Sequence, residues 1–403
     1  MKKLLSIVLA ALMLVGCIAT FASCSETPAT GAPSDFKVGA IYITGKNDTA
    51  GYTFAHANGI NKAVKALGLP EENLIVIDNI PEDTTQVTTA IDTLANQGCN
   101  IIFGISFGYI DAFDAAAKNE KYSDIIFSHA TGYLSSLPGE SAGYKAQFNN
   151  YFGRIYQARY LAGIAAGLKT LEVKNNNVGY VAAYGTQYAE TCSGINGFTL
   201  GVLSVNPDAK VYVQEIGNWA DETLEAQIAQ NLIDTYDCCV IAQHCDSAQP
   251  QIVAAKNGAF GCGYNSDMSD KSATHLTAPI WNWEVYYTAA IKCAMETPDK
   301  FMDEIGIYYG GLKEGFIDIS PLTDNCAENT KEIVEAVKKL MIDGEWDVFS
   351  GVELSYKVED GKVEIIKTET PLLKNDGTPA GAVDDGVIKG SMAYFVKGVV
   401  EAK

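Results

Sequence analysis

The first part of the chain alternates short, continuous apolar runs with stretches in which apolar residues recur at helical spacing. The apolar runs are Val38–Ile43, Leu74–Ile77, Ile101–Gly104 and Ile125–Phe127. Helix-like stretches separate them at residues 54–67, 84–96 and 111–119. A run that is apolar at every position is typical of a parallel strand buried on both faces. The pattern therefore predicts βα units, a parallel sheet and right-handed crossover connections.

The same rhythm begins again after a long helical stretch at residues 156–168. Apolar runs follow at residues 178–183, 211–213, 239–242 and 260–263, with helix-like stretches at 195–204, 222–234 and 248–257. Because 403 residues exceed one ordinary hydrophobic core, we expect two similar α/β lobes, each Rossmann-like, with a boundary near residues 147–150. Residues 356–365 contain an Asp-Gly dipeptide between alternating residues, which predicts a hairpin.

The N-terminus has the features of an export signal. Lys2 and Lys3 precede a nearly continuous apolar stretch at residues 4–22, and a small, polar stretch follows it. This pattern predicts a signal peptide at residues 1–24 and a flexible linker at 25–35. Both Cys24 and Cys17 follow residues that resemble a bacterial lipobox. We favour Cys24 as the lipidated residue and keep Cys17, or a plain signal peptide, as alternatives.

The charge balance and the short motifs exclude several kinds of function. A formal net charge of −20 disfavours binding to a phosphate backbone, so we expect no nucleic-acid partner. The sequence has no C-x-x-C pair, Gly-rich phosphate loop, HExxH helix or EF-hand loop, so we predict no cofactor and no metal. Most of the eight cysteines after residue 24 lie in apolar surroundings and are expected to be small core residues.

Aromatic and polar side chains gather where the predicted strands end. Open parallel sheets bind ligands beyond the carboxyl ends of their strands, so these residues are candidates for a cleft between two lobes. Aromatic rings can stack on a planar ligand, and polar groups can bind its edge. Each aromatic residue could instead fill a core, and the polar residues could cap helices or turns. The candidates are Tyr52, Phe54, His56, Phe107, Trp219, Gln243, His244, Asp246, Asn265, Asp267, Trp281 and Trp283.

One motif favours an enzyme instead. Residues 104–108 form a G-x-S-x-G pattern between a predicted strand and a predicted helix, which is the setting of a nucleophile elbow. A serine hydrolase using Ser106 is therefore an alternative, although any strand-to-helix turn of an open α/β sheet favours glycine and serine.

Several longer motifs resemble the basic membrane protein family of substrate-binding lipoproteins, whose members include purine nucleoside receptors. The resemblance covers residues 36–345 and rests on residues 51–56, 107–112, 159–163, 194–198 and 263–267. It implies a monomeric, lipid-anchored clamp of the periplasmic-binding-protein type I fold, facing out of the cell and serving an ABC permease. It also implies a first lobe of residues 36–148 plus 281–312 and a second of 149–280 plus 313–403. By position, Trp219 would stack on the ligand, and Asp48 and Asp111 would bind its edge.

The chain departs from the nucleoside-binding pattern at two positions. Asn265 stands where such members have an aspartate, and Trp281 stands where they have a lysine; in the family these groups look like ribose readers. Replacing a carboxylate and an ammonium by uncharged side chains removes charge-assisted hydrogen bonds to the ribose hydroxyls. The indole of Trp281 would also fill the space that a ribose needs. We therefore expect a purine nucleobase ahead of a nucleoside. A sensory receptor of the same fold for another ring, such as a sugar or a flavin-like group, is a further alternative.

Overall fold

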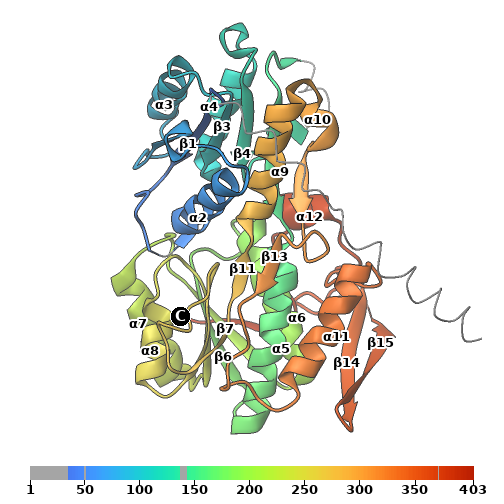
Figure 1. Ribbon diagram of the computed structural model, residues 1–403. Coiled ribbons are helices and arrows are strands. Elements are labelled where there is room, and N and C mark those ends of the chain that lie inside the picture. The colour runs from blue at the N-terminus through green and yellow to red at the C-terminus, as the bar shows by residue number, and fades with distance from the viewer. Residues whose placement is uncertain (1–34, 50, 137–142, 371) are drawn as a thin grey trace, which may run out of the picture.

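The computed structural model describes residues 35–49, 51–136, 143–370 and 372–403 of the 403-residue chain. It contains two α/β lobes, one above the other in Figure 1, with several crossings of the chain between them. The predicted signal peptide, most of the linker, and both Cys17 and Cys24 lie outside the described residues.

The first lobe is built on a six-stranded sheet in which every neighbouring pair is parallel. Its strand order is β12-β5-β4-β3-β1-β2. Burial on both faces explains why β1 and β3 are apolar throughout and fully buried. The strands are β1 (Val38–Tyr42), β2 (Leu74–Ile77), β3 (Ile101–Ile105), β4 (Ile126–Ala130), β5 (Phe148–Gly153) and β12 (Tyr308–Gly310). The helices that follow the first three strands are α2 (Gly51–Ala66), α3 (Thr84–Asn96) and α4 (Ile110–Ala117).

The second lobe repeats this arrangement around a second parallel sheet, in the order β10-β9-β8-β6-β7-β16. The predicted pair of parallel-sheet lobes is therefore confirmed. The strands are β6 (Asn177–Ala182), β7 (Lys210–Glu215), β8 (Val240–His244), β9 (Phe260–Cys262), β10 (His275–Thr277) and β16 (Val399–Glu401). Its helices include α5 (Ile155–Val173), α6 (Ala189–Val205), α7 (Glu222–Tyr236), α8 (Gln249–Lys256) and α11 (Thr330–Asp343).

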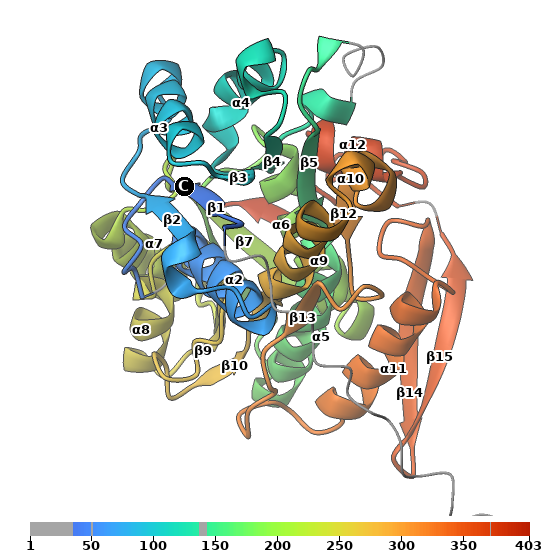
Figure 2. The same cartoon turned by 45° about the horizontal axis from the view of Figure 1, so that its top comes forward.

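The hinge region consists of chain segments that pass from one sheet to the other. β11 (Pro279–Trp281) pairs antiparallel with β13 (Ile317–Ile319), and α9 (Trp283–Glu296) then returns to the first lobe beside α2 (Figure 2). Near them lie α10 (Phe301–Glu304) and α12 (Asp385–Gly390). The exact limits of the two lobes stay a prediction.

The C-terminal part contains the predicted hairpin. β14 (Val352–Glu359) and β15 (Lys362–Glu369) pair antiparallel around Asp360 and Gly361, which have φ angles of 49° and 71°. Two successive positive φ angles are what a type I′ turn requires, so the Asp-Gly prediction is confirmed together with its physical reason.

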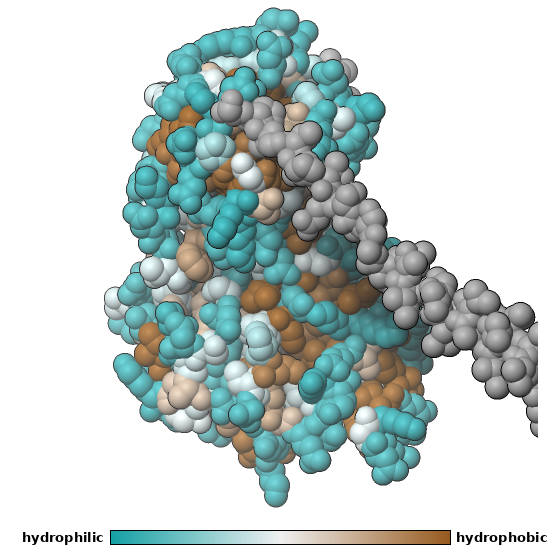
Figure 3. Space-filling view, viewed as in Figure 1, coloured by the Kyte–Doolittle hydropathy of each residue, from teal (hydrophilic) through white to brown (hydrophobic). Residues whose placement is uncertain are grey.

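The surface residues and the cysteines can be described together. On the face in Figure 3, hydrophilic residues cover much of both lobes, with hydrophobic patches between them. In the part of the chain that the structure describes, no helix is long and apolar enough to cross a bilayer. The eight cysteines after residue 24 are all unpaired, and six of them are buried.

An aromatic cluster joins α2 to α9 in the first lobe. Trp283 is 1% exposed, and its ring stacks 3.7 Å from that of His56 and 4.5 Å from that of Trp281, centroid to centroid. His56 is fully buried, with Nδ1 2.6 Å from the Tyr287 hydroxyl. Burial lowers the pKa of His56 well below its ordinary value, so the ring is neutral and acts as part of the core.

We therefore predict that Trp283→Ala lowers the free energy of unfolding by about 3–5 kcal/mol, the usual cost of deleting a large buried aromatic side chain. Val285→Ala on the same helix is the matched control, because Val285 is 36% exposed and its truncation should cost under about 0.5 kcal/mol. Urea denaturation followed by circular dichroism measures both. Equal, small effects would show that the α2–α9 contact is loosely packed.

Candidate functional site

The carboxyl ends of the strands of both sheets meet at what we call the lobe interface. Here Gly51, at the start of α2, lies against Asp246, which follows β8: a Cβ built on Gly51 would be 3.3 Å from the Asp246 Cβ. The rings of Phe107 from the first lobe and Tyr188 from the second are 6.5 Å apart. Gly51 has a φ of +83°, so this close approach and this backbone both favour glycine.

Aromatic side chains form one part of the lobe interface. Trp219 is 36% exposed, and its ring lies 5.4 Å from that of Tyr184 and 6.2 Å from that of Tyr188. The Trp219 carbonyl accepts a 3.0 Å hydrogen bond from the Asp246 N–H, which fixes the loop after β7 to the loop after β8. Phe107, across the interface, is 45% exposed. These half-exposed rings have faces that no core packing uses, so they can stack on a planar molecule.

A charged network lies beneath this aromatic group in the second lobe. Glu190, in the first turn of α6, has Oε2 3.0 Å from His244 Nε2. Arg159 on α5 has Nη2 3.3 Å from the same His244 nitrogen, and its guanidinium lies 5.2 Å from the centre of the Tyr264 ring. Arg159 is 2% exposed and His244 is fully buried. A buried guanidinium needs a nearby carboxylate, which Glu190 supplies.

Asp246 carries an acidic group into the contact between the lobes. Burial raises the pKa of Asp246 to about 7, and the negative charges of Glu225, Asp48 and Glu190 add to this rise. The backbone N–H of Tyr52, in the first turn of α2, opposes this rise. Asp246 from one lobe therefore lies at the N-terminus of a helix from the other, where a negative charge is favourable.

Asn265 and Trp281 bind each other. The indole Nε1–H of Trp281 donates a 3.0 Å hydrogen bond to Asn265 Oδ1. Asn265 is buried with a φ of +59°, and Trp281 packs against Trp283, Phe152 and Phe316 in the hinge. The two positions at which the sequence departs from the nucleoside-binding pattern thus form one hydrogen-bonded pair, which nothing in the sequence could show.

The structure places the remaining predicted site residues in four different settings. Phe54 and Asp267 line a cavity of about 250 Å³ between the lobes, together with Thr49, Ala248, Ser266 and residues 268–271. Asp48 and Gln243 make local bonds, with Thr44 and with the carbonyls of Cys245 and Ser247. Asp111 is exposed in the first turn of α4, whereas His56 and Trp283 lie in the first-lobe core described above.

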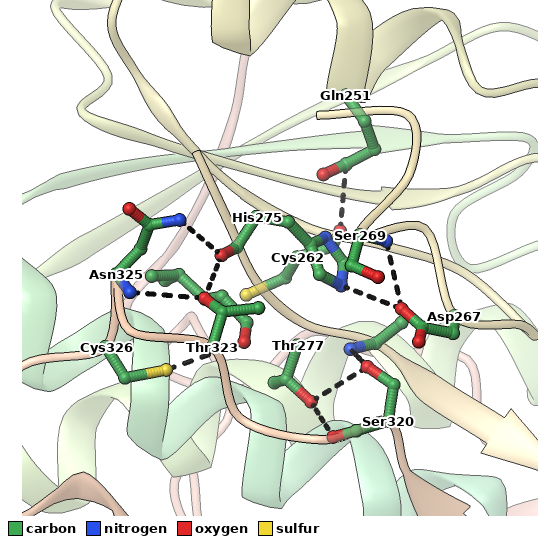
Figure 4. A network of polar contacts seen from close by, with 12 residues as sticks. Gln251, Cys262, Asp267, Ser269, His275, Thr277, Ser320, Thr323, Asn325 and Cys326 are labelled. Carbon is green, nitrogen blue, oxygen red and sulfur yellow. Dashed lines mark hydrogen bonds and ion pairs between the residues drawn. The ribbon is translucent and has the colours of Figure 1, made fainter. Parts of the chain in front are cut away.

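Asp267 also belongs to the polar network of Figure 4. Its Oδ1 accepts a 2.9 Å bond from the Ser269 N–H and lies 4.0 Å from His275 Nε2. In the same network the Thr277 hydroxyl donates to the Ser320 carbonyl, 2.7 Å away, which ties β10 to the segment after β13. The Asp267 carboxylate therefore stabilises a turn at the rim of the lobe interface.

The geometry around Ser106 does not form a nucleophile and base pair. The Ser106 hydroxyl donates to Glu82 Oε1 at 2.5 Å, and the Gly108 N–H donates to the same oxygen at 2.7 Å. His129 Nε2 lies 2.8 Å from the Ser106 carbonyl rather than from its hydroxyl. The Ser-His-acid triad of a nucleophile elbow needs a histidine on the serine hydroxyl, and Glu82 lies there instead, so the geometry supports a strand-to-helix turn.

Reasoning from the sequence missed Glu190, Tyr184 and Tyr188. They follow β6 within eight residues, so the strand-end rule that selected Trp219 would also have selected them. Their partners Arg159 and His244 come from α5 and β8, and only the fold brings these segments together.

Two parallel-sheet lobes, joined by a hinge and meeting at the carboxyl ends of their strands, are the architecture of the periplasmic-binding-protein type I fold. Residues 36–348 match the Bmp family, described as ABC transporter substrate-binding protein PnrA-like. The chain belongs to this family, whose members bind a small molecule for an ABC transporter; an ABC permease is thus its partner.

Individual relatives agree with this assignment. The chain is 32% identical to a purine-binding protein of Brucella abortus over 387 residues, which cover 95% of this chain and 98% of the relative. It is 34% identical to a provisionally named ABC transporter glucose-binding protein of Haloferax volcanii over 272 residues, 67% of this chain and 63% of the relative. A solved solute-binding protein of Conexibacter woesei shares the fold, with a TM-score of 0.59, 18% identity, and coverage of 77% of this chain and 98% of that one.

The raised pKa of Asp246 predicts a pH dependence of stability. The folded state holds the Asp246 proton up to about pH 7, whereas an unfolded aspartate loses it near pH 4. The contribution of Asp246 to the free energy of unfolding is therefore fully present below pH 4 and is lost as the pH rises through 7. Asp246→Asn should remove the part of the pH-dependent loss of stability that this carboxyl causes. The free energy of unfolding in urea, measured from pH 4 to 8, tests this.

Asp111→Asn, at an exposed position, is the control and should leave the decline unchanged. If Asp246→Asn also left it unchanged, the Asp246 carboxyl would have to be solvated rather than held between the lobes.

Proposed function

We propose that this chain captures a purine between its two lobes and delivers it to an ABC importer. The observation that carries the proposal is the set of half-exposed aromatic rings at the lobe interface, Phe107 from one lobe and Trp219, Tyr184 and Tyr188 from the other. Stacked rings stabilise flat heterocycles by about 1–3 kcal/mol each. The purine-binding protein of Brucella abortus, alike over nearly the whole chain, supports the same ligand class.

Within this class we propose a free nucleobase ahead of a nucleoside. The single N–H of the Trp281 indole donates to the Asn265 carbonyl oxygen, so it is not free to donate to a ribose hydroxyl. The Trp281 ring is also held by Trp283 and Phe152, so moving it aside for a sugar would cost packing. A site of this kind gains little from a ribose and must make room for it.

We propose the cell surface as the place of this function, with lipid on Cys24 or, alternatively, on Cys17. The polar linker after residue 24 would let the folded lobes reach the permease. A sugar is the second candidate ligand, and the glucose-binding relative of Haloferax volcanii favours it. A sensory receptor of the same fold is the alternative to transport.

The stacking part of the proposal predicts that Trp219→Ala weakens purine binding by about 1–3 kcal/mol while the protein stays folded. Isothermal titration calorimetry with adenine gives the affinity, and thermal denaturation without ligand tests the fold. Leu171→Ala, at a 48% exposed position on α5, is the control and should bind as the parent does. Unchanged affinity together with a large fall in melting temperature would assign Trp219 to the core instead.

The nucleobase part predicts that adenine or guanine raises the melting temperature more than adenosine or guanosine at equal concentration, because ligand stabilisation follows concentration over Kd. Trp281→Lys should reduce the difference between the melting-temperature shifts caused by bases and by nucleosides. The substitution removes the indole from the space that a ribose needs, and the ammonium can donate a hydrogen bond to a ribose hydroxyl. Strong stabilisation by nucleosides alone would contradict the inference from Asn265 and Trp281. Stabilisation by glucose but by no purine would replace the ligand class.

A further inference from the structure

The charged network of Arg159, His244 and Glu190 is more than a neutralised core charge, because its members differ in exposure. Arg159 and His244 have side chains that are 2% and 0% exposed, whereas 26% of the Glu190 side chain is exposed. Arg159 comes from α5, His244 from the end of β8, and Glu190 from the first turn of α6. Two buried groups therefore hold the third at the surface of the second lobe that meets the first.

The hydrogen bonds fix the protonation of this network. Burial lowers the pKa of His244, and the adjacent Arg159 charge lowers it further, so the imidazole is neutral at pH 7. A neutral ring whose Nε2 lies 3.0 Å from a carboxylate carries its proton there and donates it to Glu190 Oε2, so the 3.3 Å approach of Arg159 Nη2 to the same nitrogen is a contact and not a hydrogen bond. Nδ1 then bears the lone pair, and this buried atom has no hydrogen-bond partner among the described residues.

Glu190 stays ionised in this setting. Burial raises the pKa of Glu190, but His244 and Arg159 together lower it by more, and the carboxyl pKa ends below its ordinary value. His244 occupies Oε2, while the contact of Oε1 with Arg159 is a 4.0 Å ion pair rather than a hydrogen bond. Glu190 therefore presents a negatively charged oxygen whose lone pairs accept no hydrogen bond from the described residues, and a carboxylate oxygen can only accept.

The Glu190 carboxylate lies within electrostatic range of the other lobe. Its negative charge raises the pKa of Tyr52 on α2 and of Tyr309 on β12, both in the first lobe, and also that of Tyr264 after β9 in its own lobe. Tyr188, two residues before Glu190, belongs to the aromatic group with Trp219. A planar molecule stacked on that aromatic group would place its edge next to an acceptor of full negative charge.

We propose that Glu190 is a specificity-determining residue that accepts a hydrogen bond from the N–H edge of the bound ring. The proposal rests on the function proposed above and names the chemistry of the ligand more narrowly. The carboxylate selects heterocycles that present a ring N–H or an exocyclic amine, and it disfavours analogues whose nitrogens are methylated or only accept. His244 and Arg159 are positioning residues, which act through Glu190.

The test compares adenine with N6,N6-dimethyl-9-methyladenine, a purine of the same ring that has no N–H. A hydrogen bond to a charged group contributes about 1.5–3 kcal/mol, so the parent protein should bind adenine about 10- to 100-fold more tightly than this analogue. Glu190→Gln should weaken adenine binding and leave the analogue nearly unchanged, so that the preference falls by about that factor. Calorimetric titration gives both affinities.

The design includes two further variants. Glu190→Asp keeps the charge near Arg159 but withdraws the carboxylate by one methylene, and it should lose the preference even if Glu190→Gln folds poorly. Glu172→Gln is the matched control, because the Glu172 side chain is 51% exposed and pairs with Lys169 in the same lobe. It should keep both affinities.

The outcomes separate the two proposals. If the parent binds adenine and the Glu190 variants keep the full preference for it, Glu190 only balances Arg159 and this inference is wrong while the proposed function stands. If the parent binds neither purine, the proposed function is wrong. The inference that Glu190 accepts a hydrogen bond from a purine N–H is then wrong as well. Loss of the preference in both Glu190 variants, but not in Glu172→Gln, supports the inference.

Discussion

The common direction of the strands in each sheet is the constraint on which the rest of this structure depends. In a parallel sheet all carboxyl ends lie at one edge, and the crossover helices cover both faces, so that edge is where loops can carry function. Two such sheets face each other here, joined through β11, β13 and the end of β5. Trp219, Glu190 and Asp246 follow three different strands of the second sheet and still meet, because those strands end together.

Much of the fold could be predicted because burial on both faces makes a strand apolar at every position. β1, β3 and the helices between the strands follow directly from that rule. The rule did not predict β5, because Asn149 and Asn150 interrupt its apolar run. Both are buried, and their amides bond to Tyr286, the Gly306 carbonyl and Ser135, which are partners that only the fold supplies.

The candidate site was predictable only in part, for a related reason. The strand-end rule identifies which loops face the other lobe, and it selected Trp219 and Asp246. It cannot tell which residues of those loops point into their own lobe, so it also selected Trp283 and His56, which α9 and α2 bury against each other. The rule also cannot detect that Trp281 and Asn265 are hydrogen-bonded to each other, which is what decides their role in the site.

The central claim is that a purine base holds the two lobes together in the arrangement described here. Small-angle X-ray scattering of the purified protein during a titration with adenine tests it most directly. The account predicts that the radius of gyration falls as adenine binds, that the change saturates at one adenine per chain, and that the final value is the one calculated for the two lobes as described above. A radius of gyration that adenine leaves unchanged and above the calculated value, at concentrations that saturate a purine site, would contradict it.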